Sequence, residues 1–270
     1  MTNTLPHDGE RVVEATYSTT DEGRNILAMH LASYRRVVEL CAGKDVLDLG
    51  CGSGYGIGSL ASVTKSATGV DVSAPAIAYA NECYRAGNLR FQTIEANRPT
   101  PFSAESFDVV LSFQVIEHVP DDRAYVAEIR RLLRPGGLAV FITPDRRTRL
   151  FSFQKPWNRW HLREYSAESL SALVSTSLRI TTSEVMQGSP EPVAAELKRY
   201  RVTRWLTLPF TLPFASERLR VAGLALLSRL ATAFQHRRAG IGVEDSPNDD
   251  YWFESGTAPG LNVLVVAEKA

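Results

Sequence analysis

Hydrophobic residues along the first half of the chain alternate between two kinds of spacing. Short apolar runs predict strands at 45–49, 66–73, 89–96, from 107 onward, and at 138–144. Helical spacing of apolar residues predicts helices at 23–41, 74–87 and 121–137, the last two closed by glycine. Strands that alternate with helices of this length predict a parallel sheet covered by helices on both faces.

The second half is less regular. A helix is expected to begin near Ser166, a sixth strand at 178–186 and a final strand at 261–269. The predicted fold is therefore α/β, a Rossmann-like, doubly wound and mostly parallel seven-stranded sheet with a C-terminal insertion. We expect an N-terminal arm (1–22), a core (23–187 and 261–270) and an insertion (188–260).

Composition narrows the class of protein. The chain has 270 residues, 44% hydrophobic and 22% charged, which is typical of a soluble globule with a sizeable core. Thirty basic and thirty acidic residues give no formal net charge, which argues against a nucleic-acid partner. Cys41, Cys51 and Cys83 lack metal-ligand spacing and are typical of a reduced, cytoplasmic protein. No apolar run suggests a signal peptide or a transmembrane segment.

A glycine-rich turn follows the first predicted strand, in the stretch VLDLGCGSGYG (46–56). Glycines stand at 50, 52 and 54, where a dinucleotide-binding turn would have the spacing GxGxxG, and Asp48 lies two residues before the first of them. A carboxylate here repels phosphate and favours an ammonium group. Asp71, at the end of the second strand, suits a ribose diol. The pattern favours a ligand with a cationic amino-acid head followed by an adenosine.

Four motifs in order resemble those of class I S-adenosylmethionine-dependent methyltransferases: VLDLGCGSGYG, GVDVS, SFDVVLSFQVIEHV and LLRPGGLAVFITP. The resemblance runs from about residue 23 to 186 and implies S-adenosyl-L-methionine as cofactor and S-adenosyl-L-homocysteine as product. It implies that the methionine part binds at Asp48, Gly50, Cys51, Gly52, Gly54 and Tyr55, the ribose at Asp71 and Val72, and the adenine beside Glu95 and Ala96. Ser112 and Phe113 are expected to border the cofactor.

A narrower resemblance lies in GER (9–11), HLASYRRVVELCAGK (30–44), VIEHV (115–119) and HLREYSAESL (161–170). These segments are similar to a methyltransferase branch of bacterial glycan and glycolipid biosynthesis. The branch implies methylation of a hydroxyl on a sugar or polysaccharide precursor. Alternatives are a quinone precursor, lipid or other secondary metabolite as acceptor, an NAD-dependent dehydrogenase, and a binding protein without catalysis. SFQVIEH stands where nucleic-acid amino-methyltransferases have Asn/Asp-Pro-Pro-aromatic, which disfavours that activity.

Histidines are the candidate bases, because a hydroxyl acceptor must lose a proton during transfer. His118 follows the fourth strand and is the first choice, with Glu117 either orienting it or simply entering a helix. His161, past the fifth strand, is a candidate for catalysis or acceptor binding, or a packed loop residue. His30, on the first helix, is better explained by core packing.

Aromatic residues are candidates for the acceptor site. Trp157 and Trp160 could stack on a sugar ring or belong to the core, and Tyr17 on the N-terminal arm could fold over the site. We expect no protein-bound metal, although the pair at 249–250 keeps Mg²⁺ possible.

The insertion has three possible roles. Residues 197–238 carry nine Lys/Arg against one acid, Glu217, with aromatic residues between them. Such a segment could be a lid over the acceptor, a homodimer contact or a membrane-surface helix. Pro209 and Pro213 are expected to break any long amphipathic helix, which favours the lid and the dimer contact.

Overall fold

The computed structural model describes residues 17, 20–235, 250–256 and 258–270. Its strands are β1 (Asp45–Leu49), β2 (Ser66–Asp71), β3 (Leu89–Thr93), β4 (Phe107–Phe113), β5 (Leu133–Pro144), β6 (Arg179–Gly188), β7 (Tyr251–Glu254) and β8 (Asn262–Glu268). Its helices are α2 (Asp21–Arg36), α3 (Val38–Cys41), α4 (Tyr55–Leu60), α5 (Ala74–Cys83), η1 (Ile116–His118), α6 (Asp122–Leu132), α7 (Arg146–Arg149), α8 (Ala167–Val174), α9 (Pro190–Thr207), η2 (Leu208–Phe210) and α10 (Glu217–Gln235).

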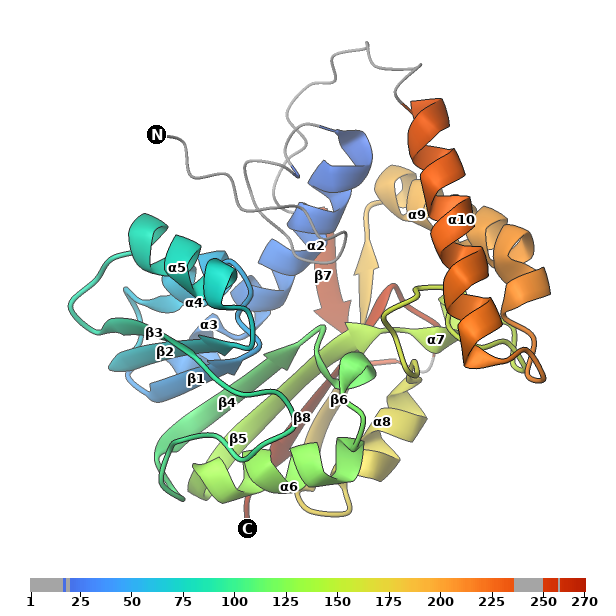
Figure 1. The fold of residues 1–270 in the computed structure, drawn as a ribbon. Helices are drawn as coiled ribbons and strands as arrows, with labels where there is room; N and C mark the ends of the chain where they lie inside the picture. The colour runs from blue at the N-terminus through green and yellow to red at the C-terminus, as the bar shows by residue number, and fades with distance from the viewer. Residues whose placement is uncertain (1–16, 18–19, 236–249, 257) are drawn as a thin grey trace.

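One sheet contains all of these strands, in the order β3-β2-β1-β4-β5-β8-β6-β7 (Figure 1). The first five strands of that order are parallel, and β8 enters antiparallel between β5 and β6. The predicted Rossmann-like α/β class is confirmed. The sheet has an eighth strand, β7, because residues 251–254 from the predicted insertion pair with β6 and bury Tyr251.

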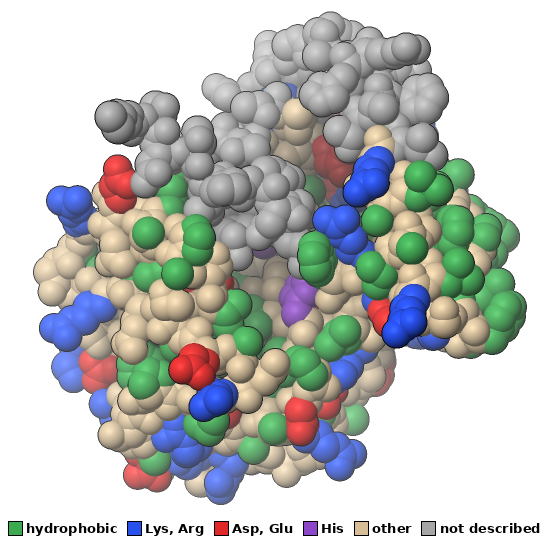
Figure 2. Space-filling view, in the orientation of Figure 1, with side chains coloured by type: hydrophobic (Ala, Val, Ile, Leu, Met, Phe, Trp, Pro, Cys, Tyr) green, Lys and Arg blue, Asp and Glu red, His purple; other side chains and the backbone are tan. Residues whose placement is uncertain are grey.

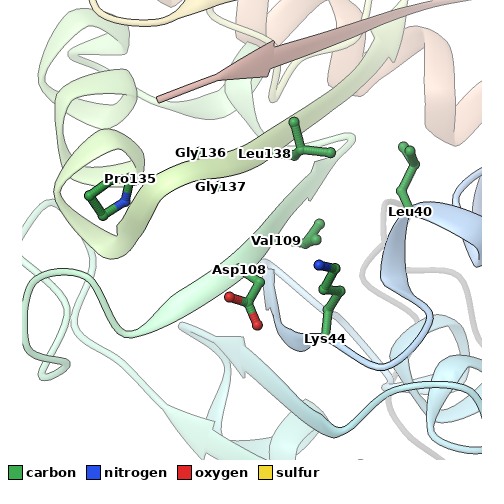
Figure 3. A pocket seen from close by; sticks show the side chains of 8 residues that line it. All are labelled: Leu40, Lys44, Asp108, Val109, Pro135, Gly136, Gly137 and Leu138. Atoms are coloured by element: carbon green, nitrogen blue, oxygen red, sulfur yellow. The ribbon is translucent and has the colours of Figure 1, made fainter. Parts of the chain in front are cut away.

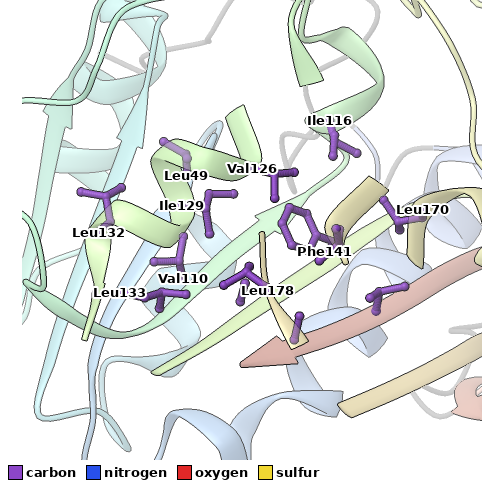
Figure 4. Packing of buried hydrophobic residues seen from close by; sticks show 14 of the residues in the cluster. Leu49, Val110, Ile116, Val126, Ile129, Leu132, Leu133, Phe141, Leu170 and Leu178 are labelled. Atoms are coloured by element: carbon purple, nitrogen blue, oxygen red, sulfur yellow. The ribbon is translucent and has the colours of Figure 1, made fainter. Parts of the chain in front are cut away.

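Helices cover both faces of the sheet, as the alternating pattern predicts. On one face α6 packs against β4 and β5 and α8 packs against β6 and β8, with Val126, Ile129 and Leu170 fully buried beside Phe141 (Figure 4). On the other face α2–α5 pack against β1, β2 and β4. The carboxyl ends of the parallel strands therefore meet at one edge, where the candidate residues gather.

The predicted insertion contains two long helices. Pro209 and Pro213 lie between α9 and α10 and separate them, so each helix still reaches 18 or 19 residues. Both prolines therefore interrupt the helical segment as expected, although the helix on each side of them is itself long. Gly223 allows α10 to lie against η2, since a Cβ there would be 2.2 Å from the Phe210 ring.

A buried arginine ties α10 to the loop that follows β5. The Arg220 guanidinium donates to the carbonyl oxygens of Pro156, Asn158, Arg159 and His161. This loop carries Trp160 and His161, so α10 fixes the backbone of two candidate residues. Within the described part of the chain, no helix is both long enough and apolar enough to cross a membrane.

Candidate functional site

The glycine turn after β1 is built from backbone conformations that side chains rarely adopt. Gly50, Gly52 and Gly54 have φ of 97°, 55° and 86°. A Cβ on Gly50 would lie 2.4 Å from Cγ2 of Val115. The Gly52 N–H donates to Oδ2 of Asp71 at 3.0 Å, which joins the turn to the end of β2. The glycine turn, called the glycine cradle below, and the Asp71 carboxylate therefore lie together.

A cavity of about 930 Å³ opens above this turn, at the carboxyl ends of the parallel strands. Figure 2 shows it as the hollow at the centre of the face, with a histidine side chain inside. The predicted residues that line it are Gly50, Cys51, Gly52, Tyr55, Asp71, Val72, Glu95, Ala96, Phe113, His118 and Trp160. A large concave site with a few converging polar groups is what small ligands require.

The other predicted residues lie outside the cavity lining. Gly54 turns the chain into α4, and the Ser112 hydroxyl is buried against that of Tyr125 at 2.9 Å. The Trp157 indole donates to the Arg149 carbonyl and packs within the protein. Tyr17 packs against the cluster beneath α2. Acceptor contacts of Trp157 and Tyr17 stay a prediction, since both side chains pack partly buried and neither lines the cavity.

Asp48 is fully buried beneath the turn. Its Oδ2 accepts a hydrogen bond from the Tyr34 hydroxyl at 2.8 Å, while its Oδ1 has no hydrogen-bond partner. Burial raises the pKa of Asp48 to about 7; the Tyr34 hydrogen bond opposes this rise and the charge of Asp71 adds to it. Asp48 therefore has one unpaired oxygen beneath the glycine turn, in surroundings that favour the protonated form of its carboxyl.

Among the lining residues that were not predicted for the site, three carry polar ring side chains on helices. Tyr34 and His30 come from α2, and Tyr125 comes from α6. Burial lowers the pKa of His30 to about 4, so this ring is neutral, and its Nδ1 lies 2.7 Å from the Tyr55 hydroxyl. The sequence signal for these residues was a polar atom on an otherwise apolar helix face. A residue that only packs in the core does not require such an atom.

The rings of His118 and His161 lie side by side. Their ring centroids are 4.8 Å apart and the rings are perpendicular. His118 Nδ1 lies 3.2 Å from the Trp160 carbonyl oxygen, which can only accept, so Nδ1 carries the hydrogen and the neutral ring has its basic lone pair on Nε2. His118 lines the cavity, whereas His161 is buried behind it.

Glu117 faces away from the cavity lining and toward the protein interior. Its Oε2 accepts from the Thr143 hydroxyl at 2.9 Å, and its Oε1 is buried without a hydrogen-bond partner. Burial raises the pKa of this carboxyl. Side-chain ligand atoms of Glu117, His118 and His161 lie within 4.8 Å of one another. Glu117 and His161 therefore lie buried beside His118, where they can position its ring.

Buried charged residues contact His161 on the side away from the cavity. His161 Nδ1 lies 2.9 Å from Glu164, whose other oxygen accepts from the Arg149 guanidinium at 3.1 Å. Burial lowers the pKa of His161, which keeps the ring neutral. Of the acidic pair considered for Mg²⁺, residue 249 lies outside the described residues, so that prediction gains no structural support.

A second, smaller cavity lies at the opposite end of the sheet. It has about 190 Å³ and lies between Lys44, Asp108 and residues 135–138, near the amino ends of β1 and β4 (Figure 3). None of the predicted site residues lines it. The larger cavity is therefore the candidate active site.

Comparisons with known proteins indicate a methyltransferase domain. Residues 47–141 match the family model described as a methyltransferase domain. A relative from Mycolicibacterium smegmatis, named "Probable S-adenosylmethionine-dependent methyltransferase", is 36% identical over 66% of this chain and 66% of its own length. A ubiquinone biosynthesis O-methyltransferase of Thiobacillus denitrificans is 35% identical over 41% of this chain and 48% of its own length.

Solved structures share the fold. A SAM-dependent methyltransferase from Thermotoga maritima superposes with a TM-score of 0.55 at 18% identity, covering 92% of this chain and 93% of that one. At this identity the likeness concerns the fold alone. The chain spans slightly less than two thirds of the Mycolicibacterium relative and about half of the Thiobacillus one.

Proposed function

Since the chain carries a class I S-adenosylmethionine-dependent methyltransferase domain, we propose that the whole protein methylates a hydroxyl group of a small molecule. One observation carries the proposal: a glycine cradle with a buried carboxylate beneath it and a histidine of defined tautomer share one cavity. The first element suits the cationic cofactor, and the second suits a proton acceptor.

The described residues fit S-adenosyl-L-methionine. The cradle above Asp48 would hold its amino-acid part, and the Asp71 carboxylate would hold the ribose diol. Val72 is 57% exposed, and this unusual apolar exposure at the cavity suits the face of an adenine ring. When bound, the cofactor supplies an electrophilic methyl group, so the protein has to orient the acceptor and manage its proton.

His118 is the proposed general base. Because its Nδ1–H is directed to the Trp160 carbonyl, Nε2 can take the hydroxyl proton as the acceptor oxygen bonds to the methyl carbon. The perpendicular ring of His161 and the buried Glu117 hold His118 in place. The protein thus provides both orientation and a place for the proton.

For the acceptor, we propose a sugar or polysaccharide precursor. The Trp160 indole is 49% exposed at the rim of the cavity, beside His118, and an exposed aromatic face is a platform for a sugar ring. The second candidate is a phenolic quinone precursor, favoured by the relatives named ubiquinone biosynthesis O-methyltransferases. Both acceptors present a hydroxyl to the same base.

A competition between acceptor classes tests this proposal. The purified protein with radiolabelled S-adenosyl-L-methionine is offered nucleotide sugars and polysaccharide fragments in one series and catechols in the other. We expect labelled methyl ether from the sugar series. Methyl label in the catechol series alone would show that the acceptor is a phenol and not a sugar. Binding of NAD(H) without binding of S-adenosyl-L-homocysteine would overturn methyl transfer itself.

Cofactor binding is expected to depend on pH through Asp48. Because its pKa is about 7, this carboxyl holds a proton at pH 6 and is ionised at pH 8. The ammonium group of S-adenosyl-L-homocysteine is attracted only by the ionised form, so affinity falls as pH falls. Below pH 7 we expect Kd to rise about tenfold per pH unit, measured by calorimetry.

Two variants separate this effect from general loss of stability. Asp48→Asn is expected to abolish the pH dependence and to weaken binding at pH 8 by about 10- to 100-fold, because the counter-charge is gone. Asp45→Asn, at the amino end of the same strand, changes a carboxyl whose pKa is lowered to about 2 by Ser66 and Lys65. This control should keep the pH dependence. A wild-type Kd that is flat between pH 6 and 8 would exclude Asp48 from binding.

A further inference from the structure

We propose that the outer faces of α9 and α10 bind the surface of an anionic lipid membrane. This proposal does not depend on methyl transfer. It starts from an outward-facing set of apolar side chains on α9, on the turn before α10 and on α10 itself: Trp205, Leu206, Phe214, Leu219 and Leu226. Phe214 is 85% exposed and Trp205 is 59% exposed, which is far more than apolar side chains usually show.

Exposed hydrophobic side chains gather on the side of the molecule where α9 and α10 lie. Figure 2 shows hydrophobic side chains gathered along the right-hand edge, where Figure 1 places α9 and α10. The opposite sides of both helices face the protein, since Tyr200 is buried on α9 and Leu224 on α10. Each helix therefore packs one side against the protein and carries exposed apolar side chains on the other.

Cations lie among the exposed apolar residues. Lys198 and Arg201 share the exposed face of α9, and Arg218 and Arg229 share that of α10. The one acid between 197 and 229 is Glu217, which is bound by the Arg220 guanidinium at 3.0 Å. The face, defined by these apolar and basic residues and called the α9–α10 face below, is thus both apolar and positively charged.

Exposed apolar and basic side chains together favour an anionic lipid surface as the partner of this face. Tryptophan, phenylalanine and leucine insert at the boundary between lipid headgroups and acyl chains, while lysine and arginine attract anionic headgroups. A second copy related by a two-fold axis would place these cations against their own equivalents, which costs energy. Charge complementarity therefore favours an anionic lipid surface over the homodimer predicted from the sequence.

Vesicle sedimentation tests the proposal with the whole protein. We expect binding to vesicles of phosphatidylcholine with phosphatidylglycerol, weaker binding to phosphatidylcholine alone, and release by high salt, since the screening length falls to about 3 Å at 1 M salt. Trp205→Ala with Phe214→Ala, and separately Arg201→Glu with Arg218→Glu, should each lower the partition coefficient by about tenfold or more.

Matched controls lie away from the α9–α10 face. Trp252→Ala removes a tryptophan of similar exposure (45%) on β7, and Arg130→Glu reverses an exposed arginine on α6. Both controls should bind vesicles as the wild type does. The proposal is overturned if the wild-type protein does not bind the anionic vesicles, or if the face variants bind as well as the controls. It is also overturned if light scattering shows a dimer that Trp205→Ala with Phe214→Ala dissociates.

Discussion

His118→Ala is expected to lower kcat by about 10²- to 10⁴-fold, the usual contribution of a positioned general base. The affinity for S-adenosyl-L-homocysteine should stay within about threefold of wild type, because the glycine turn and Asp71, not His118, are proposed to hold the cofactor. Turnover is measured by methyl transfer from labelled cofactor, and affinity by calorimetry. A kcat within a few-fold of wild type would remove His118 from the mechanism.

Two further measurements distinguish a lost base from a displaced acceptor. Added imidazole should restore part of the turnover of His118→Ala, because a small base can enter the space that the ring leaves. The loss should also be smaller for an acceptor with a more acidic hydroxyl, since such an oxygen needs less help in releasing its proton. A purely steric effect of the substitution would give the same loss for acceptors of equal size.

The cofactor half of the site could be predicted from sequence because it depends on local rules. A strand that ends in glycines, and an acid at the end of the next strand, fix Gly50, Gly52 and Asp71 through backbone geometry and parallel pairing. The same rules placed His118 just past β4, where the structure has it. Spacing along the chain was sufficient for these residues.

The remaining residues depend on contacts between distant segments. Trp157 and Trp160 are equivalent by sequence, but the Arg149 guanidinium lies 4.0 Å over the Trp157 ring and keeps it inside, while Trp160 reaches the cavity. His30 and Tyr34 could be read as core residues of an amphipathic helix, because periodicity does not say which turn meets a cavity. β7 was missed because YWFE is short and pairs only with β6.

Gly50→Ala is expected to abolish measurable cofactor binding, with Kd raised by about 10²-fold or more. The φ of 97° is strained for any residue with a Cβ, and that Cβ would lie 2.4 Å from Val115. The strain alone should lower the free energy of unfolding by about 1–3 kcal/mol, because the surrounding strands hold the turn. The clash adds a displacement of Val115, which itself lines the cavity.

Gly136→Ala is the matched control for that substitution. Gly136 also has a positive φ, 75°, but a Cβ there would meet nothing within 4 Å, and the residue lies at the small cavity at the other end of the sheet. We expect a similar loss of stability in thermal unfolding and unchanged cofactor affinity. Val115→Ala in the Gly50→Ala background should recover part of the binding, since it removes the contacting methyl groups. If Gly50→Ala and Gly136→Ala bound the cofactor equally well, the turn could not be the cradle, because only one of the two glycines lies in the cavity.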